Sequence, residues 1–555
     1  CESNPQNAII YLMKAYISEL VKESLQAISP DEAETVLGSG VFDVSYPKPG
    51  FGDYATNAAM VLFKKFNVAP AKNPMEFAEV LASKIKELDH KNSFVKVESV
   101  GGFINFTLSE QFLLNRLQNV LTEAENFGRS DVGDKRTVIV EYFQNNIAKP
   151  PHVGHLRSAV IGDSLVRILK FAGYKTLTDT HIGDWGVQFG ILLHAYKEFL
   201  KAGGSKEQIE KDPIIELNKL YVDMSAQIDT TPELRDLGKA EFQKLEAGDA
   251  ENREAWEWFV KVSYEDFEKY RQLLGINSFD HNLGESFYED KMTQVLNQFE
   301  EKGLITIGET GEKYVDLEEQ NLGRCILVKS DGATTYHLRD FATYIYRKNE
   351  FDFYRNLYIV DVRQSHHFRQ LFRVLEMAGY SSETDSAHLD FGFMTLPEGA
   401  ISTRKGTTIS LENLLAEANK RALEIIQEKN PDLADKQKVS KQVALAAIKY
   451  FDLSHNRSTE IVFTWDKALS FDGNTGPYLQ YTHARIQGIF RKMGEDMASV
   501  KGAEFTGELA AQETAVLRKI QQFAEIIESA SEQYLPNIIC NYLFELAQSF
   551  NAFYQ

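Results

Sequence analysis

The chain has 555 residues, too many for one hydrophobic core, so we expect two to four domains. Its 43% hydrophobic and 25% charged residues are typical of a globular protein and exclude a disordered or collagen-like chain. The net charge of −20 argues against a general affinity for nucleic acid. Any nucleic-acid partner must therefore be bound by local basic patches.

Neither a run of membrane-spanning length nor a signal-peptide pattern is found in the sequence. Cys1, Cys325 and Cys540 have neither paired nor metal-binding spacing, which suits a reducing cytoplasm. We expect Cys325 and Cys540 to be buried as small hydrophobic residues. Because the sequence starts without Met and stops inside a helical pattern, we also expect residues to be missing at both ends.

Residues 1–110 are predicted to form a small α+β domain. Apolar residues recur at helical spacing in Asn7–Ile28 and Pro74–Leu88, while Val95–Val100 and Gly102–Leu108 are typical of paired strands. The polar segment Asn126–Arg136 then marks a boundary.

Two aromatic residues, Phe51 and Tyr54, lie in the turn-rich segment between the two predicted helices. An exposed aromatic side chain can stack on a nucleic-acid base. The alternative, for at least one of them, is packing in the core of the domain.

The next segment predicts a β-loop-α-β unit, the building block of a parallel sheet. Thr137–Phe143 and Tyr174–Thr180 are β-branched, strand-like runs. Between them, a loop rich in Asn and Pro precedes a helical pattern that starts at Val153 and stops at Gly173.

His152, Gly154 and His155 stand at the N-terminus of that predicted helix. Free backbone N–H groups and the helix dipole favour an anion there, and Gly154 allows close approach to the backbone. Imidazoles three residues apart lie on one face and can donate to phosphate oxygens. A simple helix cap is the alternative.

Helical patterns dominate the middle of the chain, in Ile191–Lys201, Pro213–Ala226 and Pro232–Gly275, and predict a helical insertion. Strand signals resume at Thr335–Leu338 and Leu357–Val362.

Tyr336 and Asp340 would share a face if they began a helix, since they are four residues apart. A carboxylate and an aromatic ring are the groups that bind a guanidinium, through bidentate hydrogen bonds and a cation–π contact. An ordinary surface pair is the alternative. Glu141 and Glu285 are weaker candidates for additional negative charge.

Gln364 follows a predicted strand and would lie at the carboxyl edge of the sheet, where ligands collect in open α/β folds. Together with Asn146 it could hold an amino acid's α-ammonium and carboxylate. His366 and His367 are adjacent, so their side chains should point apart, and we predict no metal site there.

The C-terminal part is predicted to be an all-α bundle. Within it, Tyr481, His483 and Arg485 are of types that stack on bases or pair with phosphates, although they could equally bridge helices. The predicted helices are Leu411–Glu428, Gln437–Phe451, Tyr478–Met493, Ala510–Ala530 and Asn537–Tyr554.

Several strings resemble those of one family, the arginyl-tRNA synthetases of class I, which carry a "HIGH" signature. These strings are His152-Val153-Gly154-His155, Asn146-Ile147-Ala148-Lys149, Gly183-Asp184-Trp185-Gly186-Val187-Gln188-Phe189-Gly190, FGDYATNAAM and GGFINF near the N-terminus, and Gly476–Arg485. The resemblance extends over nearly the whole chain.

The resemblance implies a Rossmann-like parallel-sheet α/β catalytic domain with helical insertions at residues 130–407. It also implies an N-terminal domain at 1–110 that binds the tRNA elbow, and an all-α anticodon-binding domain at 408–555. The implied activity is that of an arginine–tRNA ligase, a cytoplasmic monomer that joins L-arginine to tRNA(Arg) with ATP. Mg²⁺ is expected to accompany ATP, without a metal site on the protein.

The resemblance also assigns roles to single residues. Catalytic roles fall to His152, His155, Lys149 and Lys405. ATP binding falls to His152, Gly154, His155, Ser402, Arg404 and Lys405. Arginine binding falls to Glu141, Asn145, Asn146, His155, Glu285, Tyr336, Asp340 and Gln364. Contacts with tRNA fall to Phe51, Tyr54, Tyr481, His483 and Arg485.

The sequence departs from the family pattern in two places. The loop Ile401–Thr407 stands where the family carries its "KMSKS" signature, but Ala400 replaces the leading Lys, and Lys149 is the expected substitute. Before Asn146 the chain has Gln144 and Asn145 instead of the family's Ser-Pro or Ala-Pro pair.

Two alternatives remain open. One is another class I ligase or nucleotidylyltransferase with a different amino-acid pocket. The other is a catalytically silent, RNA-binding paralogue, which the altered Ala400-Ile401 favours and the intact His152 and His155 oppose.

Overall fold

The computed structural model describes residues 12–36, 42–66, 71–382, 384–396, 399–400, 410–495 and 508–555. The chain divides into two compact units. Unit 1 consists of residues 1–132, 478–533 and 538–555, and unit 2 of residues 133–477 and 534–537.

Unit 1 contains a four-stranded antiparallel sheet in the order β1-β2-β4-β3. Gly101 and Gly102 have φ angles of +59° and +88° and form the tight turn between β3 and β4. The strands are β1 (Val44–Ser45), β2 (Tyr54–Thr56), β3 (Phe94–Val100) and β4 (Phe103–Leu108).

Helices α2 (Met13–Ile28) and α5 (Pro74–Leu88) pack with this sheet in one core. The α5 prediction is confirmed; Asn73 caps the helix by accepting from the N–H groups of Met75 and Glu76. Shorter helices in this part are α3 (Pro30–Val36), α4 (Ala58–Leu62) and α6 (Glu110–Glu123).

The C-terminal helices complete unit 1, and Leu517 of α20 is part of the same core as the sheet. These helices are α19 (Gly476–Met493, whose first two residues belong to unit 2), α20 (Ala511–Gln521), α21 (Phe523–Gln533) and α22 (Asn537–Tyr554).

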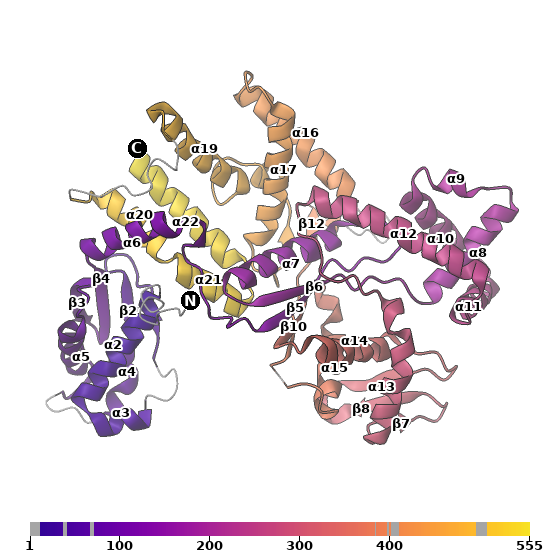
Figure 1. Ribbon diagram of the computed structural model, residues 1–555, viewed down its shortest axis with the longest axis horizontal. Helices are drawn as coiled ribbons and strands as arrows, with labels where there is room; N and C mark the ends of the chain where they lie inside the picture. Colours follow the sequence, from indigo (N-terminus) through magenta and orange to yellow (C-terminus); the bar gives the residue numbers. More distant parts are fainter. Residues whose placement is uncertain are drawn as a thin grey trace. The chain divides into compact units, whose positions relative to one another are not determined.

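Unit 2 is built on a parallel sheet in the order β11-β10-β5-β6. Figure 1 shows helix α7 on one side of β5, β6 and β10, with α14 and α15 on the other. The predicted β-loop-α-β unit is confirmed as β5–α7–β6. The strands are β5 (Thr137–Glu141), β6 (Lys175–Asp179), β10 (Arg355–Tyr358) and β11 (Ser386–His388), and the helices are α7 (Val153–Phe171), α14 (Tyr336–Phe351) and α15 (Ser365–Met377).

The register of this sheet aligns the carboxyl ends of three strands. Glu141 of β5 is opposite Asp179 of β6 on one side and Tyr358 of β10 on the other. Side chains that follow these residues therefore gather at one edge, as the sequence predicted for Gln364.

The predicted helical insertion is present, with one correction. Pro232–Gly275 is not one helix but two, because the chain turns at Gly248, whose φ is +81°. The insertion comprises α8 (Val187–Lys201), α9 (Lys206–Ile209), α10 (Pro213–Thr230), α11 (Glu233–Glu246) and α12 (Ala250–Leu273).

The strand predicted at Thr335–Leu338 is wrong, because α14 already begins at Tyr336, with Thr335 at its N-cap position. Tyr336 and Asp340 are therefore on a helix, in the arrangement their spacing predicted. The preceding elements are α13 (Glu289–Glu301), β7 (Thr306–Ile307), β8 (Lys313–Leu317) and β9 (Gly323–Val328).

Helices α16 (Leu411–Lys429) and α17 (Lys436–Leu453) belong to unit 2, although the sequence placed them in a C-terminal domain starting at residue 408. A buried ion pair explains the difference: Arg157 of α7 lies 3.0 Å from Asp452 of α17. The remaining strands are β12 (Met394–Leu396), β13 (Gly399–Ala400) and β14 (Ile461–Val462), followed by α18 (Trp465–Ala468).

Cys325 and Cys540 are buried, as predicted. Of the helices in the described ranges, none combines the length and the apolar character that crossing a membrane requires.

Candidate active site

A cavity of about 610 Å³ lies at the carboxyl edge of the unit 2 sheet. Its lining brings together residues from separate parts of the sequence. The predicted site residues that line it are Glu141, Asn146, His152, Gly154, His155, Glu285, Tyr336, Asp340 and Gln364. Its volume is within the range of small-molecule binding sites.

One wall of the cavity is the N-terminus of α7. His152 Nδ1 accepts from the N–H of Gly154 at 3.0 Å, and His155 Nδ1 accepts from the N–H of His152 at 3.1 Å. The two rings stack with centroids 3.9 Å apart. Because both Nδ1 atoms are acceptors, a neutral ring carries its proton on Nε2, which becomes a hydrogen-bond donor.

Both imidazoles are held neutral near pH 7. Burial lowers the pKa of His152, and the nearby Lys149 lowers it further. Burial, together with His152 and Lys149, lowers the pKa of His155 well below its ordinary value. This wall therefore presents N–H donors and the positive end of a helix to a ligand.

The amide side chain of Asn146 is packed against the backbone of Gly183. A β-carbon at Gly183 would lie 2.1 Å from Asn146 Oδ1, so only glycine fits there. The N–H of Gly183 also donates to the carbonyl of Asn145, and the N–H of Ile147 donates to the carbonyl of Gly183. The GDWG string is thus part of the wall that holds Asn146.

Another part of the lining, the anionic wall, contains Tyr336, Asp340 and Glu285. Tyr336 is 53% exposed, so its ring is available to a ligand. Burial is the largest influence and raises the pKa of Asp340, but the hydrogen bond from His367 and the charges of His367, His181 and Arg339 together outweigh it, and the pKa is lower than its ordinary value. Asp340 is therefore anionic at neutral pH, and this wall attracts a cation.

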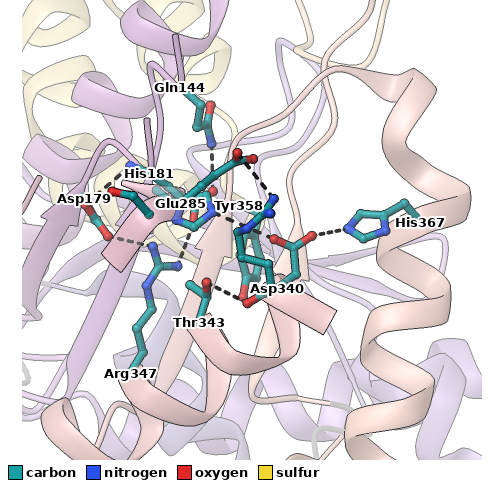
Figure 2. A network of polar contacts seen from close by, with 12 residues as sticks. Gln144, Asp179, His181, Glu285, Asp340, Thr343, Arg347, Tyr358 and His367 are labelled. Carbon is teal, nitrogen blue, oxygen red and sulfur yellow. Dashed lines mark hydrogen bonds and ion pairs between the residues drawn. The ribbon is translucent and has the colours of Figure 1, made fainter. Parts of the chain in front are cut away.

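Beneath that wall, Arg347 of α14 is fully buried between two strand ends. Its guanidinium lies 2.5 Å from Glu141 and 2.8 Å from Asp179. Figure 2 shows Arg347 reaching toward Asp179, on the same helix as Asp340. Two carboxylates on neighbouring strands need such a cation, which also ties α14 to the sheet.

Comparison with known proteins agrees with this geometry. Residues 116–465 match the family described as "tRNA synthetases class I (R), catalytic domain". Residues 15–108 match "Arginyl tRNA synthetase N terminal domain" and residues 479–555 match "DALR anticodon binding domain". The "Arginine--tRNA ligase" of Clostridioides difficile (strain 630) is 40% identical over 98% of this chain and 92% of its own length.

The chain belongs to the arginyl-tRNA synthetase family. Solved structures of the family have the same fold. The arginyl-tRNA synthetase of Plasmodium falciparum superposes with a TM-score of 0.79 at 26% identity, over 98% of this chain and 92% of that one. The Thermus thermophilus arginyl-tRNA synthetase gives 0.78 at 24% identity, with the same coverage.

Some residues that the family resemblance assigned to the site are not in the cavity lining. Asn145 is buried beside it, and neither of its side-chain polar atoms has a hydrogen-bond partner among the described residues. Lys149 lines a neighbouring cavity of about 210 Å³ that shares Asn146 with this one. Ser402, Arg404 and Lys405 are outside the described residues.

The residues predicted to contact tRNA are all in unit 1. Tyr54 is wrong as a stacking residue, because it is buried and its hydroxyl donates to Glu525. Phe51, 45% exposed, and Tyr481, 48% exposed, are accessible, as is His483. Arg485 is half-buried and donates to Asn551 and to the Tyr481 hydroxyl.

Sequence reasoning missed His181, Arg347 and the contact of His367 with the site. His181, which follows β6, and His367 of α15 line the cavity, and Arg347 contacts Glu141 of the same lining. The sequence does not reveal the positive φ of +41° at His181. The position of His181, two residues before Gly183 of the GDWG string, could however have marked it as a site residue.

Proposed function

We propose that this chain is an arginine–tRNA ligase that works in two steps within the described cavity. In the first step, the carboxylate of L-arginine attacks the α-phosphorus of ATP. A carboxylate–phosphorus bond forms, the α–β phosphoanhydride bond breaks, and pyrophosphate leaves. In the second step, the 2′-hydroxyl of the terminal adenosine of tRNA(Arg) attacks the arginyl carbonyl, and AMP leaves.

One observation carries this proposal. The imidazole wall, formed by His152 and His155, and the anionic wall line a single cavity. His152 and His155 would donate Nε2–H groups to the triphosphate, and Gly154 would leave room for it. Lys149 is the basic residue next to His152 and His155. Arg404 and Lys405 would neutralise negative charge on the triphosphate, and Ser402 would donate a hydrogen bond to it.

The arginine would lie across the same cavity with its guanidinium on the anionic wall. Asp340 would pair with it, Tyr336 would offer its ring, and Glu285 would add negative charge. Asn146 and Gln364 would hold the α-ammonium and carboxylate groups near His155. Catalysis then depends on positioning and charge stabilisation, without a covalent enzyme intermediate.

Mg²⁺ would enter with the ATP and supply charge neutralisation on its phosphates. Among the residues that the structure describes, no group of three or more His, Cys, Asp or Glu side chains is arranged to hold a metal ion. For tRNA we propose contacts at Phe51 in the N-terminal domain and at Tyr481, His483 and Arg485 in the anticodon-binding domain. We place the enzyme in the cytoplasm as a monomer.

The test is charging of total tRNA with each of the twenty amino acids by the purified protein. Arginine alone should be attached, and Asp340→Ala should raise the KM for arginine by about tenfold or more, because a charge-assisted pair is lost. Attachment of a different amino acid would identify another class I ligase. Binding of tRNA without any charging would identify a silent paralogue.

A second variant separates chemistry from helix capping. His155→Ala should reduce adenylate formation by about 10²-fold, the usual cost of losing one transition-state donor, and leave tRNA affinity within about twofold. Equal losses of adenylate formation and of tRNA affinity would mean that His155 only caps the helix.

A further inference from the structure

Asp340 differs from the other carboxylates of the cavity in its partners. Glu141, Glu285 and Asp361 each have an arginine within 3.4 Å. Asp340 instead lies between two imidazoles, with His367 Nε2 2.6 Å from Oδ2 and His181 Nε2 3.8 Å from Oδ1. Over the described ranges, no lysine or arginine nitrogen comes within 4.0 Å of it. Its charge is thus not already paired with a permanent cation.

The contact with His367 fixes which ring nitrogen carries the proton. A carboxylate oxygen only accepts, so His367 Nε2 is the donor. Nδ1 of the same ring is buried and has no hydrogen-bond partner among the described residues. The contact through Nε2 therefore fixes the orientation of the carboxylate.

The ring of His367 is itself held in place. It lies in the first turn of α15, with its centroid 4.9 Å from Tyr336 and 4.6 Å from His337. His337 Nε2 contacts Gln370 Oε1 at 3.0 Å. Burial and the neighbouring His367 lower the pKa of His337 to about 4, so His337 adds no positive charge near Asp340 at neutral pH.

We propose that His367 is a positioning residue that makes the pocket select a cationic amino-acid side chain. By holding Oδ2 of Asp340, it leaves Oδ1 directed to the cavity as an anionic acceptor for a guanidinium. Figure 2 shows His367 approaching Asp340 from the side opposite to His181 and Glu285. The inference rests on the proposed function, since it explains how the arginine pocket distinguishes charge.

The neighbouring histidine provides a matched control. His366 is exposed while His367 is buried, which agrees with the expectation that the two side chains point apart. His366→Ala therefore removes an imidazole from the same helix turn without touching Asp340. His367→Gln keeps an N–H donor at a similar distance from the backbone and serves as the conservative rescue.

The experiment measures arginine-dependent pyrophosphate exchange by the full chain with tRNA present. His367→Ala should raise the KM for arginine about tenfold or more, with kcat and the KM for ATP within about twofold of wild type. His367→Gln should reverse at least a third of that increase in the KM for arginine, and His366→Ala should match wild type. Preference for arginine over citrulline, its neutral ureido analogue, should fall in His367→Ala, because a loosely held carboxylate discriminates charge less well.

Equal changes in kcat and in both KM values, together with a lowered melting temperature for His367→Ala and His367→Gln, would overturn the inference. So would an unchanged KM for arginine in His367→Ala. If Asp340→Ala raises that KM while His367→Ala does not, only the role of His367 fails. If Asp340→Ala itself has no effect, the proposed arginine site fails.

Discussion

Histidine side chains perform different tasks in this protein according to what surrounds each ring. His152 and His155 line the cavity and accept backbone hydrogen bonds at Nδ1. His367 faces a carboxylate instead. The neighbouring residues in the sequence do not reveal these differences, because the role of each histidine depends on which ring nitrogen contacts a donor and which contacts an acceptor.

The lowered pKa values predict how stability depends on pH. Burial lowers the pKa of His152, His155, His337 and His388 in the folded chain. Unfolded histidine titrates near about 6.5, so below that pH the unfolded chain binds more protons than the folded one. These groups should therefore destabilise the fold as pH falls from 7.5 to 5.5.

His155→Gln isolates one of these contributions. The variant cannot take up a proton on unfolding, so its urea midpoint should fall less than that of wild type between pH 7.5 and 5.5. The exposed His366 provides the control, and His366→Gln should keep the wild-type pH dependence. An identical pH dependence in His155→Gln would contradict the assignment of a lowered pKa to His155.

At the scale of elements, the site depends on how α14 is fastened to the sheet. This helix carries Tyr336 and Asp340 at its N-terminal end and Arg347 two turns later. Arg347 contacts Glu141 and Asp179, which the strand register places side by side. The ion pairs therefore fix the rotation of the helix that presents the anionic wall.

Arg347→Met should destabilise unit 2 by about 3–5 kcal/mol, the usual cost of removing one partner from a buried ion pair. The variant leaves two carboxylates buried without their cation, so arginine affinity should fall as well. Thermal unfolding and the KM for arginine measure the two effects. The exposed Arg369 on α15 is the matched control, and Arg369→Met should change stability by no more than about 0.5 kcal/mol.

At the scale of the whole molecule, unit 1 is assembled from both ends of the described chain. Glu525 of α21 accepts from the hydroxyls of Tyr46 and Tyr54 and from the N–H of Lys14. Burial raises the pKa of this glutamate, with the tyrosine and backbone donors opposing the shift. One buried carboxylate thus joins the N-terminal domain to the C-terminal helices.

Glu525→Ala should lower the melting temperature of unit 1. Its loss leaves the hydroxyl of the buried Tyr54 without an acceptor, at about 1–3 kcal/mol for each such group. Differential scanning calorimetry of the full chain measures the change. Glu532→Ala, an exposed position on the same helix, should leave the transition in place; an equal shift in both variants would contradict a specific role for Glu525.

The features that could be predicted from the sequence are those that short-range rules control. Strand β5, the loop and helix α7 were predictable because β-branched runs, turn residues and helical periodicity lie within one short segment. The spacing of Tyr336 and Asp340 predicted a shared face only if they began a helix, and the strand predicted at Thr335–Leu338 was wrong. Exposure of Phe51 and burial of Tyr54 could not be separated, because the two are three residues apart in one turn-rich stretch of sequence, and only the structure places Tyr54 in β2.

The distant residues that complete the site could not be predicted from the sequence, because they meet only in the folded chain. Arg347 is 206 residues from Glu141 along the chain, and no local pattern marks it as the cation that joins two strand ends. Helix α17 is likewise joined to α7 by the buried Arg157–Asp452 pair, whose residues are 295 apart along the chain. Local periodicity sets each element, whereas burial and charge pairing between remote elements set how the elements meet, and that pairing exists only once the chain has folded.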